Sequence, residues 1–157
     1  MSATFVSVFI LVSSAFALLF WLRSVCRSIL AERFEQDYSA EVAEANQLEY
    51  LAIRTALGEY PEEIADYGGL LATLERDYEA LTYLLRNAAT LHVGRYSRTE
   101  RLLIMDFQLV RLWVRLKRAL GLHSWRSGLL EMATILQYFG NVVGQRLVTF
   151  SARLPQA

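Results

Sequence analysis

Few residues of this chain combine the types and spacing that metal chemistry needs. The two histidines, His92 and His123, are far apart in the sequence, and neither has a cysteine or carboxylate at ligand spacing. Cys26 is the single cysteine. A zinc site needs three or four converging nitrogen, sulfur or oxygen ligands. The sequence therefore predicts no metal site, no cofactor and no disulfide within the chain.

Motifs for nucleophilic catalysis or phosphate binding are also not recognisable in the sequence. The pair Gly68-Gly69 has no strand before it and no lysine after it, as a phosphate-binding loop requires. No nucleophile sits in an elbow motif, and no two carboxylates stand out from the acidic background. We therefore expect a protein that is not an enzyme, and an anchored enzyme ranks last among the functions considered.

Asp106 is the polar residue whose sequence surroundings are least polar. Its neighbours at helical spacing are Leu102, Leu103, Leu109 and Val110, which places the carboxylate in an apolar sector. A carboxylate buried there must be paired, hydrogen-bonded, neutralised or hydrated. We expect a structural bond to an arginine or a tyrosine. The alternative is an acid that specifies a partner helix or titrates.

The segment 111–126 is the best candidate binding surface, because five cations alternate in it with two tryptophans and several apolar residues. Such a composition is typical of helices at a bilayer interface, so possible partners include anionic lipid. The alternative is that Trp113 packs inside the protein and the arginines pair with the acidic first helix. No nucleic-acid-binding fold is indicated. The candidate lipid or partner surface consists of Arg111, Trp113, Arg115, Lys117, Arg118, Trp125 and Arg126.

The elements that must position these residues begin with an apolar run over residues 3–22, which contains no charge. A helix needs about 20 apolar residues to cross a bilayer. A cleaved signal peptide is the alternative, since Ala15 and Ala17 frame a small-x-small cleavage pattern. No lysine or arginine precedes the run, and cleavage would leave an apolar new terminus. We therefore predict an uncleaved transmembrane anchor.

The residues that flank this run predict its orientation. Arg23 and Arg27 follow it, whereas no charged side chain precedes it. The positive-inside rule then places the C-terminal part of the chain in the cytoplasm, with the anchor in the inner (plasma) membrane. Trp21, Arg23 and Arg27 would mark the membrane interface on that side.

The remainder of the chain is predicted to be all-α. Two prolines, Pro61 and Pro155, interrupt it, and no alternating run of β-branched residues indicates a strand. We expect a transmembrane anchor over residues 1–23 and a cytoplasmic domain over 24–157, folded as an antiparallel bundle of about four helices. Charge is uneven within that domain: residues 31–79 hold 13 acids and three bases, whereas 80–157 hold 11 bases and three acids.

Periodicity and capping signals set the expected helix boundaries. The first cytoplasmic helix is predicted to run from Ser24 to about Leu57 and to end at Gly58. Gly68-Gly69 is read as a break before the second helix. The expected later helices are 70 to about 91, 97 to about 120 with a capping box at its start, and one from Ser124 or Ser127 to about Ser151.

The clearest apolar pattern lies in the helix from residue 70, where a packing seam alternates at spacings of three and four: Leu71, Leu74, Tyr78, Leu81, Leu85 and Ala88. The helix after Ser97 is expected to pack through a face repeating at spacings of three and four, made of Leu102, Met105, Leu109, Leu112, Leu116 and Ala119. Leu129 to Val148 has the length of a second membrane span, but its polar residues favour a buried amphipathic helix. Gly140 and Gly144, one turn apart, predict a close approach of another backbone.

These observations favour a membrane-tethered interaction or scaffold protein that assembles with itself or with an integral-membrane partner. Its partners would be the lipid bilayer and either another protein or a second copy of the chain. The alternative is a bilayer-surface module that grips anionic lipid through residues 98–126. The partner's identity and the oligomeric state are not encoded in any motif of the sequence.

Overall fold

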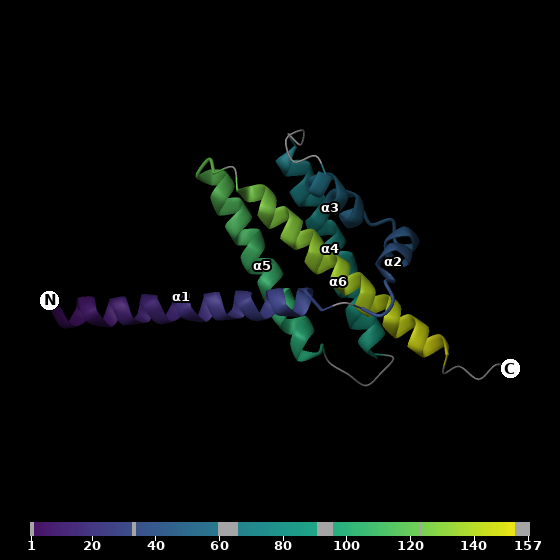
Figure 1. Ribbon diagram of the computed structural model, residues 1–157, viewed down its shortest axis with the longest axis horizontal. Helices are drawn as coiled ribbons and strands as arrows, with labels where there is room; N and C mark the ends of the chain where they lie inside the picture. The colour runs from purple at the N-terminus through teal and green to yellow at the C-terminus, as the bar shows by residue number, and fades with distance from the viewer. Residues whose placement is uncertain (1, 33, 60–65, 91–95, 123, 153–157) are drawn as a thin grey trace. The chain divides into compact units, whose positions relative to one another are not determined.

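The structure of the protein is a computed structural model that describes residues 2–32, 34–59, 66–90, 96–122 and 124–152. All regular secondary structure in these ranges is helical, which confirms the predicted all-α class. The chain divides into two compact units, residues 1–32 and 33–157. The six helices are α1 Ser2–Leu30, α2 Ser39–Ala45, α3 Tyr50–Glu59, α4 Tyr67–Thr90, α5 Arg98–Ala119 and α6 Trp125–Ser151 (Figure 1).

The first unit consists of α1 and the turn that follows it. Every residue from position 4 to position 21 is exposed, although this stretch is almost entirely apolar. Among the described helices, α1 is the one that is long and apolar enough to cross a membrane. A signal sequence near an N-terminus can be similarly long and apolar.

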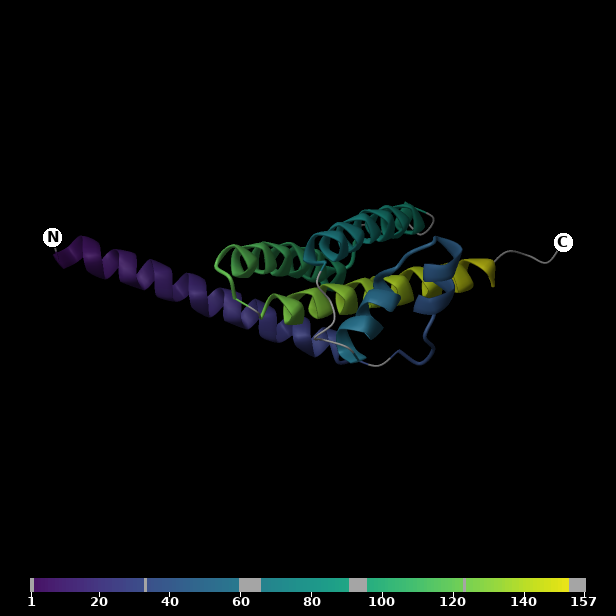
Figure 2. The same cartoon turned by 90° about the horizontal axis from the view of Figure 1, so that it is seen from above.

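The second unit is organised around α6. Each of α2, α3, α4 and α5 contacts α6, which runs through the middle of this unit (Figures 1 and 2). Its buried positions lie on several sides of the helix, as expected for a helix enclosed by partners. α6 is thus the buried helix that the sequence favours over a second membrane span. Its largest fully buried side chains are Leu129, Met132, Ile135, Leu136 and Phe139.

Two glycines of α6 allow the backbone that begins α2 to approach closely, as their spacing predicted. A methyl group at Gly144 would overlap the Cβ of Tyr38, and one at Gly140 would overlap the hydroxyl of Tyr50. The Cα of Ser39 also lies 3.4 Å from the position of that second methyl group. No larger residue fits at either glycine without a shift of its neighbours.

The predicted continuous helix from Ser24 to Leu57 is wrong, because the chain forms three helices over this range. α1 ends at Leu30, and α2 begins where α6 supplies a cap. The side-chain oxygen of Asn141 accepts hydrogen bonds from the backbone amides of Tyr38 (2.6 Å) and Ser39 (3.1 Å). An acceptor for two free amides stabilises a helix start at this position.

Asp37 adds a local cap at the same point. Its carboxylate accepts hydrogen bonds from the backbone amide (2.9 Å) and the hydroxyl of Ser39. The hydrogen bond from the Ser39 hydroxyl is the main cause that holds the pKa of Asp37 below its ordinary value. The ionised carboxylate therefore favours the helix start.

The end of α2 also lacks an obvious sequence signal. Gln47 has a φ of 54°, in the left-handed region that glycine usually occupies at helix ends. The amide of Leu48 donates to the carbonyl of Ala43 (2.9 Å), and that of Gln47 to Glu44 (3.2 Å). This pair of bonds is a Schellman motif, which closes the helix without a glycine.

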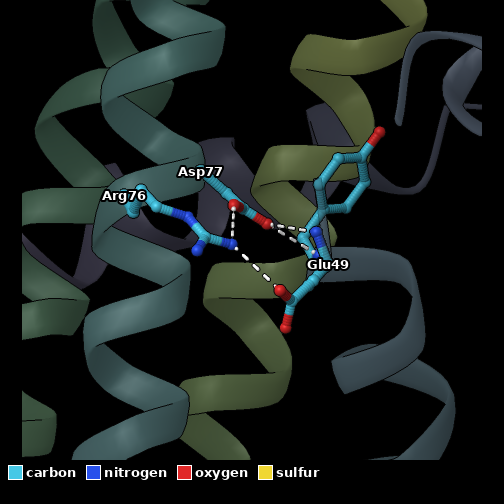
Figure 3. A network of polar contacts seen from close by, with 4 residues as sticks. Glu49, Arg76 and Asp77 are labelled. Carbon is cyan, nitrogen blue, oxygen red and sulfur yellow. Dashed lines mark hydrogen bonds and ion pairs between the residues drawn. The ribbon is translucent and has the colours of Figure 1, made fainter. Parts of the chain in front are cut away.

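α3 begins at a buried carboxylate that α4 supplies (Figure 3). The Oδ2 atom of Asp77 accepts hydrogen bonds from the amides of Glu49 (2.7 Å) and Tyr50 (2.8 Å). On the outside, the guanidinium of Arg76 bridges Asp77 (3.4 Å) and Glu49 (3.2 Å). The Tyr50 hydroxyl donates to the carbonyl of Ser39 (2.9 Å), and burial raises the pKa of that hydroxyl.

α4 begins earlier than predicted, since Gly68 and Gly69 lie in its first turn and do not break it. Asp66 supplies the cap, because its carboxylate accepts a hydrogen bond from the amide of Gly69 (2.9 Å). The four leucines of the packing face that the sequence predicts for this helix are buried, which confirms that part of the prediction. These leucines are Leu71, Leu74, Leu81 and Leu85.

The boundaries of α5 follow the sequence signals. Ser97 and Glu100 form both bonds of the predicted capping box. At the other end, Gly121 has a φ of 69° and its amide donates to the carbonyl of Arg118 (3.0 Å). The amide of Leu122 donates to the carbonyl of Lys117 (2.9 Å), which completes a Schellman motif. Glu100 also forms an ion pair with Arg146 of α6, so the cap of one helix is tied to the next.

We predict that Gly144→Ala destabilises the protein by about 1–3 kcal/mol, because the added methyl overlaps Tyr38 in a packed contact. Gly58→Ala is the matched control. Its methyl meets nothing within 4 Å inside α3, so the change should stabilise the protein by about 0.4–1 kcal/mol. Chemical unfolding of both variants in detergent, followed by circular dichroism, tests this. Equal effects of the two substitutions would contradict the close approach.

We predict that Asp77→Ala costs about 1–3 kcal/mol of unfolding free energy, because two buried amides at the start of α3 lose their acceptor. Arg76→Ala removes the exposed half of the same network and should leave the unfolding midpoint nearly unchanged. The same unfolding measurement compares them. An Arg76 variant as unstable as the Asp77 variant would show that the ion pair, and not the cap, holds α3.

Candidate interaction surface

α5 carries apolar residues on two opposite faces, and one of them is packed in the second unit. The inner face consists of Leu103, Phe107, Val110 and Val114, all buried. The ring of Phe107 stacks on that of Tyr78 in α4, with centroids 4.1 Å apart. This face joins α5 to both α4 and α6.

The face on which α5 was predicted to pack is the exposed one, so that prediction is wrong. Met105, Leu112 and Leu116 are exposed, while Leu102 and Leu109 are partly buried. Both faces repeat at helical spacing. The exposed face contains more leucines, so its apolar pattern is the more obvious one in the sequence. The inner face is the one that packs, because its aromatic and β-branched side chains fit between α4 and α6.

Two further residues widen this exposed face. Trp113 is 49% exposed and Leu120 is 64% exposed. At about 100° per residue, the set covers roughly a third of the helix circumference. A contiguous exposed apolar surface of this kind is typical of an interaction site. We call it the outer face of α5, defined as Leu102, Met105, Leu109, Leu112, Trp113, Leu116 and Leu120.

Two arginines of the predicted cationic surface are paired with α4. The guanidinium of Arg115 lies 2.7 Å from the carboxylate of Glu75, and that of Arg111 lies 3.9 Å from the same carboxylate. The acidic partner is therefore a residue of α4, and not of the predicted first cytoplasmic helix (24 to about 57). The ion pair consumes part of the positive charge that would attract an anionic surface.

An aromatic and cationic cluster lies between the start of α4 and the start of α6. It contains Arg118 of α5 and both Trp125 and Arg126 of α6. Trp125 is 6% exposed and meets Tyr67 edge to face, with centroids 5.1 Å apart. Arg118 lies over both rings, at 5.5 Å from Tyr67 and 6.0 Å from Trp125. Arg126 lies 5.5 Å from the Trp125 ring. Trp125 thus belongs to the interior, and the two arginines cover it.

The electrostatics of this cluster leave the tyrosine neutral. Burial is the main cause that raises the pKa of Tyr67, and Arg115 and Arg118 act in the opposite direction. The Nζ of Lys117 lies 3.5 Å from the carbonyl of Ser124, close to the turn between α5 and α6. Most of the predicted cationic side chains are therefore engaged within the second unit.

The remaining predicted site residues lie elsewhere. Trp21, Arg23 and Arg27 lie on α1, Trp21 exposed and Arg27 in the last turn of the helix. Asp106 lies on the inner side of α5 and is fully buried. The structure thus places three of the predicted residues on α1, Trp113 on the outer face of α5, and Trp125 and Asp106 in the interior of the second unit. The five cations of the predicted surface lie outside these groups, in the contacts with Glu75, Tyr67, Trp125 and Ser124 described above.

Sequence reasoning missed the buried polar residues that position the short helices. Asp77 caps α3 from 27 residues away in the chain, and Asn141 caps α2 from 103 residues away. No local pattern identifies a cap that comes from so far along the sequence. The available signal was a polar residue among apolar neighbours at helical spacing. In the sequence this signal identified Asp106, and it identified neither Asp77 nor Asn141.

The contacts that the described part of the chain forms at this surface are packing contacts, cation–π contacts and ion pairs. No group of three or more His, Cys, Asp or Glu side chains that could hold a metal ion occurs among these residues. The chain matches no protein-family model, no curated protein and no solved structure. The geometry of α1 and α5 therefore carries the functional argument.

We predict that the two tryptophans near the ends of α5 and α6 differ sharply in their effect on stability. Trp125→Ala should cost about 3–5 kcal/mol, because it removes a buried ring. Trp113→Ala should cost about 1 kcal/mol or less, since its ring is half exposed. Chemical unfolding of both variants in detergent measures the difference. A large loss at Trp113 would show that the outer face is packed in the isolated protein.

Proposed function

We propose that the protein is a single-pass membrane-anchored helical protein that works by binding, as an interaction or scaffold protein. It would assemble with itself or with an integral-membrane partner. Its C-terminal domain would lie in the cytoplasm as an antiparallel bundle held by α1 at the inner (plasma) membrane. The proposal assigns it no reaction.

The exposure of α1 is the observation that carries this proposal. A helix of the protein core buries its apolar side chains, whereas residues 4 to 21 of α1 are all exposed. Exposed apolar surface of this length is costly in water and favourable in a bilayer. Cleavage after Ala17 would leave an apolar new terminus, which favours an anchor over a cleaved signal peptide.

The charges that follow the apolar run support the orientation. Arg23 and Arg27 lie at its C-terminal end, and arginines next to a span are found mostly on the cytoplasmic side. The short connection from Ala119 to Trp125 supports an antiparallel course of α5 and α6, since helices joined by few residues usually run in opposite directions.

The alternative, an electrostatic module that grips anionic lipid through residues 98–126, has less support. Glu75 pairs with Arg111 and Arg115, and the buried ring of Trp125 engages Arg118 and Arg126. The outer face of α5 is instead apolar, which favours binding by contact over attraction between charges.

We predict that the full-length chain stays in the membrane pellet after alkaline carbonate extraction, and that a C-terminal fluorescent-protein fusion is fluorescent in the cytoplasm. Paired substitutions Phe9→Arg and Val12→Arg should release it, because each arginine near the span centre costs about 2.5–3.5 kcal/mol of insertion free energy. Trp21→Arg, at the edge of the span, is the control and should remain in the pellet.

A wild-type chain that carbonate extracts would contradict the anchor. Mature protein that lacks its first residues and is found outside the cytoplasm would establish the signal peptide instead.

A further inference from the structure

We infer that the outer face of α5 lies on the headgroup region of the bilayer that α1 crosses, so that the second unit rests on the membrane surface through apolar side chains. This inference rests on the proposed anchor. It assigns a second membrane contact to a surface of the folded unit, about 80 residues after the first contact in the chain.

The first argument is the composition of the outer face. Leu112, Trp113, Leu116 and Leu120 are all exposed, and so is Met105 two turns before Leu112. A tryptophan ring among leucines on one side of a helix is typical of an interfacial helix, where the ring lies at headgroup depth. A seam for one partner helix is usually narrower, because two positions in each heptad suffice for it.

The second argument is the charge around this face. The two acidic residues of α5, Glu100 and Asp106, are both buried. The charged side chains of α5 beside the outer face include the cations Arg101 and Lys117, whereas Arg115 is paired with Glu75 of α4. Cations beside an apolar face can reach lipid phosphates while the leucines enter the interface. Two copies paired through this face would instead bring like charges together at its edges.

The third argument is proximity. The eight residues between Leu30 of α1 and Ser39 of α2 extend at most roughly 29 Å. A unit on so short a tether meets the bilayer at a high effective concentration, so even a weak surface contact is populated. The membrane is therefore the partner that the proposed anchor already supplies, and no additional protein needs to be invoked.

The three tryptophans provide a direct test, since each lies in a different environment. Trp21 is on the proposed anchor, Trp113 is on the outer face, and Trp125 is buried in the second unit. The full-length chain is reconstituted into vesicles of phosphatidylcholine and phosphatidylglycerol in equal parts, with and without brominated acyl chains. Three variants each keep one tryptophan and carry phenylalanine at the other two positions.

The expected result is that brominated lipid quenches Trp21 and Trp113 but leaves Trp125 emission unchanged. Quenching of Trp113 should persist at high salt and in phosphatidylcholine alone, because apolar contact is not screened. Leu112→Gln with Leu116→Gln should reduce it. Tyr83→Gln, an exposed ring on α4 outside the outer face, is the matched control and should leave it unchanged.

The possible failures are distinguishable. Quenching of Trp21 without quenching of Trp113 overturns the inference and retains the anchor, whereas no quenching at Trp21 overturns the anchor itself. Trp113 quenching that needs anionic lipid and disappears at high salt also overturns the inference, in favour of an electrostatic grip. If Trp125→Phe unfolds the protein, Trp113→Phe alone gives the same answer, because it should lower the quenched fraction relative to the wild-type chain.

Discussion

The burial of α6 is the constraint on which the second unit depends. Each other helix of the unit contacts α6, and among the rest only α3 with α4 and α2 with α3 come close along their backbones. Apolar side chains on several sides of α6 are buried against the other helices, which favours the folded unit, while Gly140 and Gly144 let α2 approach. A substitution on α6 can therefore disturb the packing of several helices at once.

Burial on several sides of α6 leaves few places for polar groups, and the buried polar groups that are present have defined tasks. Asn141 caps α2 from α6, and Asp77 caps α3 from α4. Glu100 joins the cap of α5 to Arg146 of α6. These bonds link helix starts that are distant in the chain, so the same side chains both satisfy free amides and fix how the helices are placed.

The sequence predicts those features that depend on neighbouring residues. The capping box at Ser97, the end of α5 at Gly121 and the packing face of α4 were all read correctly from local patterns. The breaks around α2 and α3 were not, because their caps come from distant residues and Gln47 adopts a glycine-like conformation. The face of α5 that packs was misread because two apolar faces compete, and only the shape of α4 and α6 decides between them.

The order of the helices along the chain has a consequence for biosynthesis. α6, which every other helix of the second unit contacts, is the last of the six described helices to leave the ribosome. Until α6 emerges, α2 to α5 have no common surface on which to pack, whereas an N-terminal apolar helix can enter a bilayer as soon as it is made. With the anchor proposed above, folding of the second unit would follow the synthesis of α6 and take place beside the membrane.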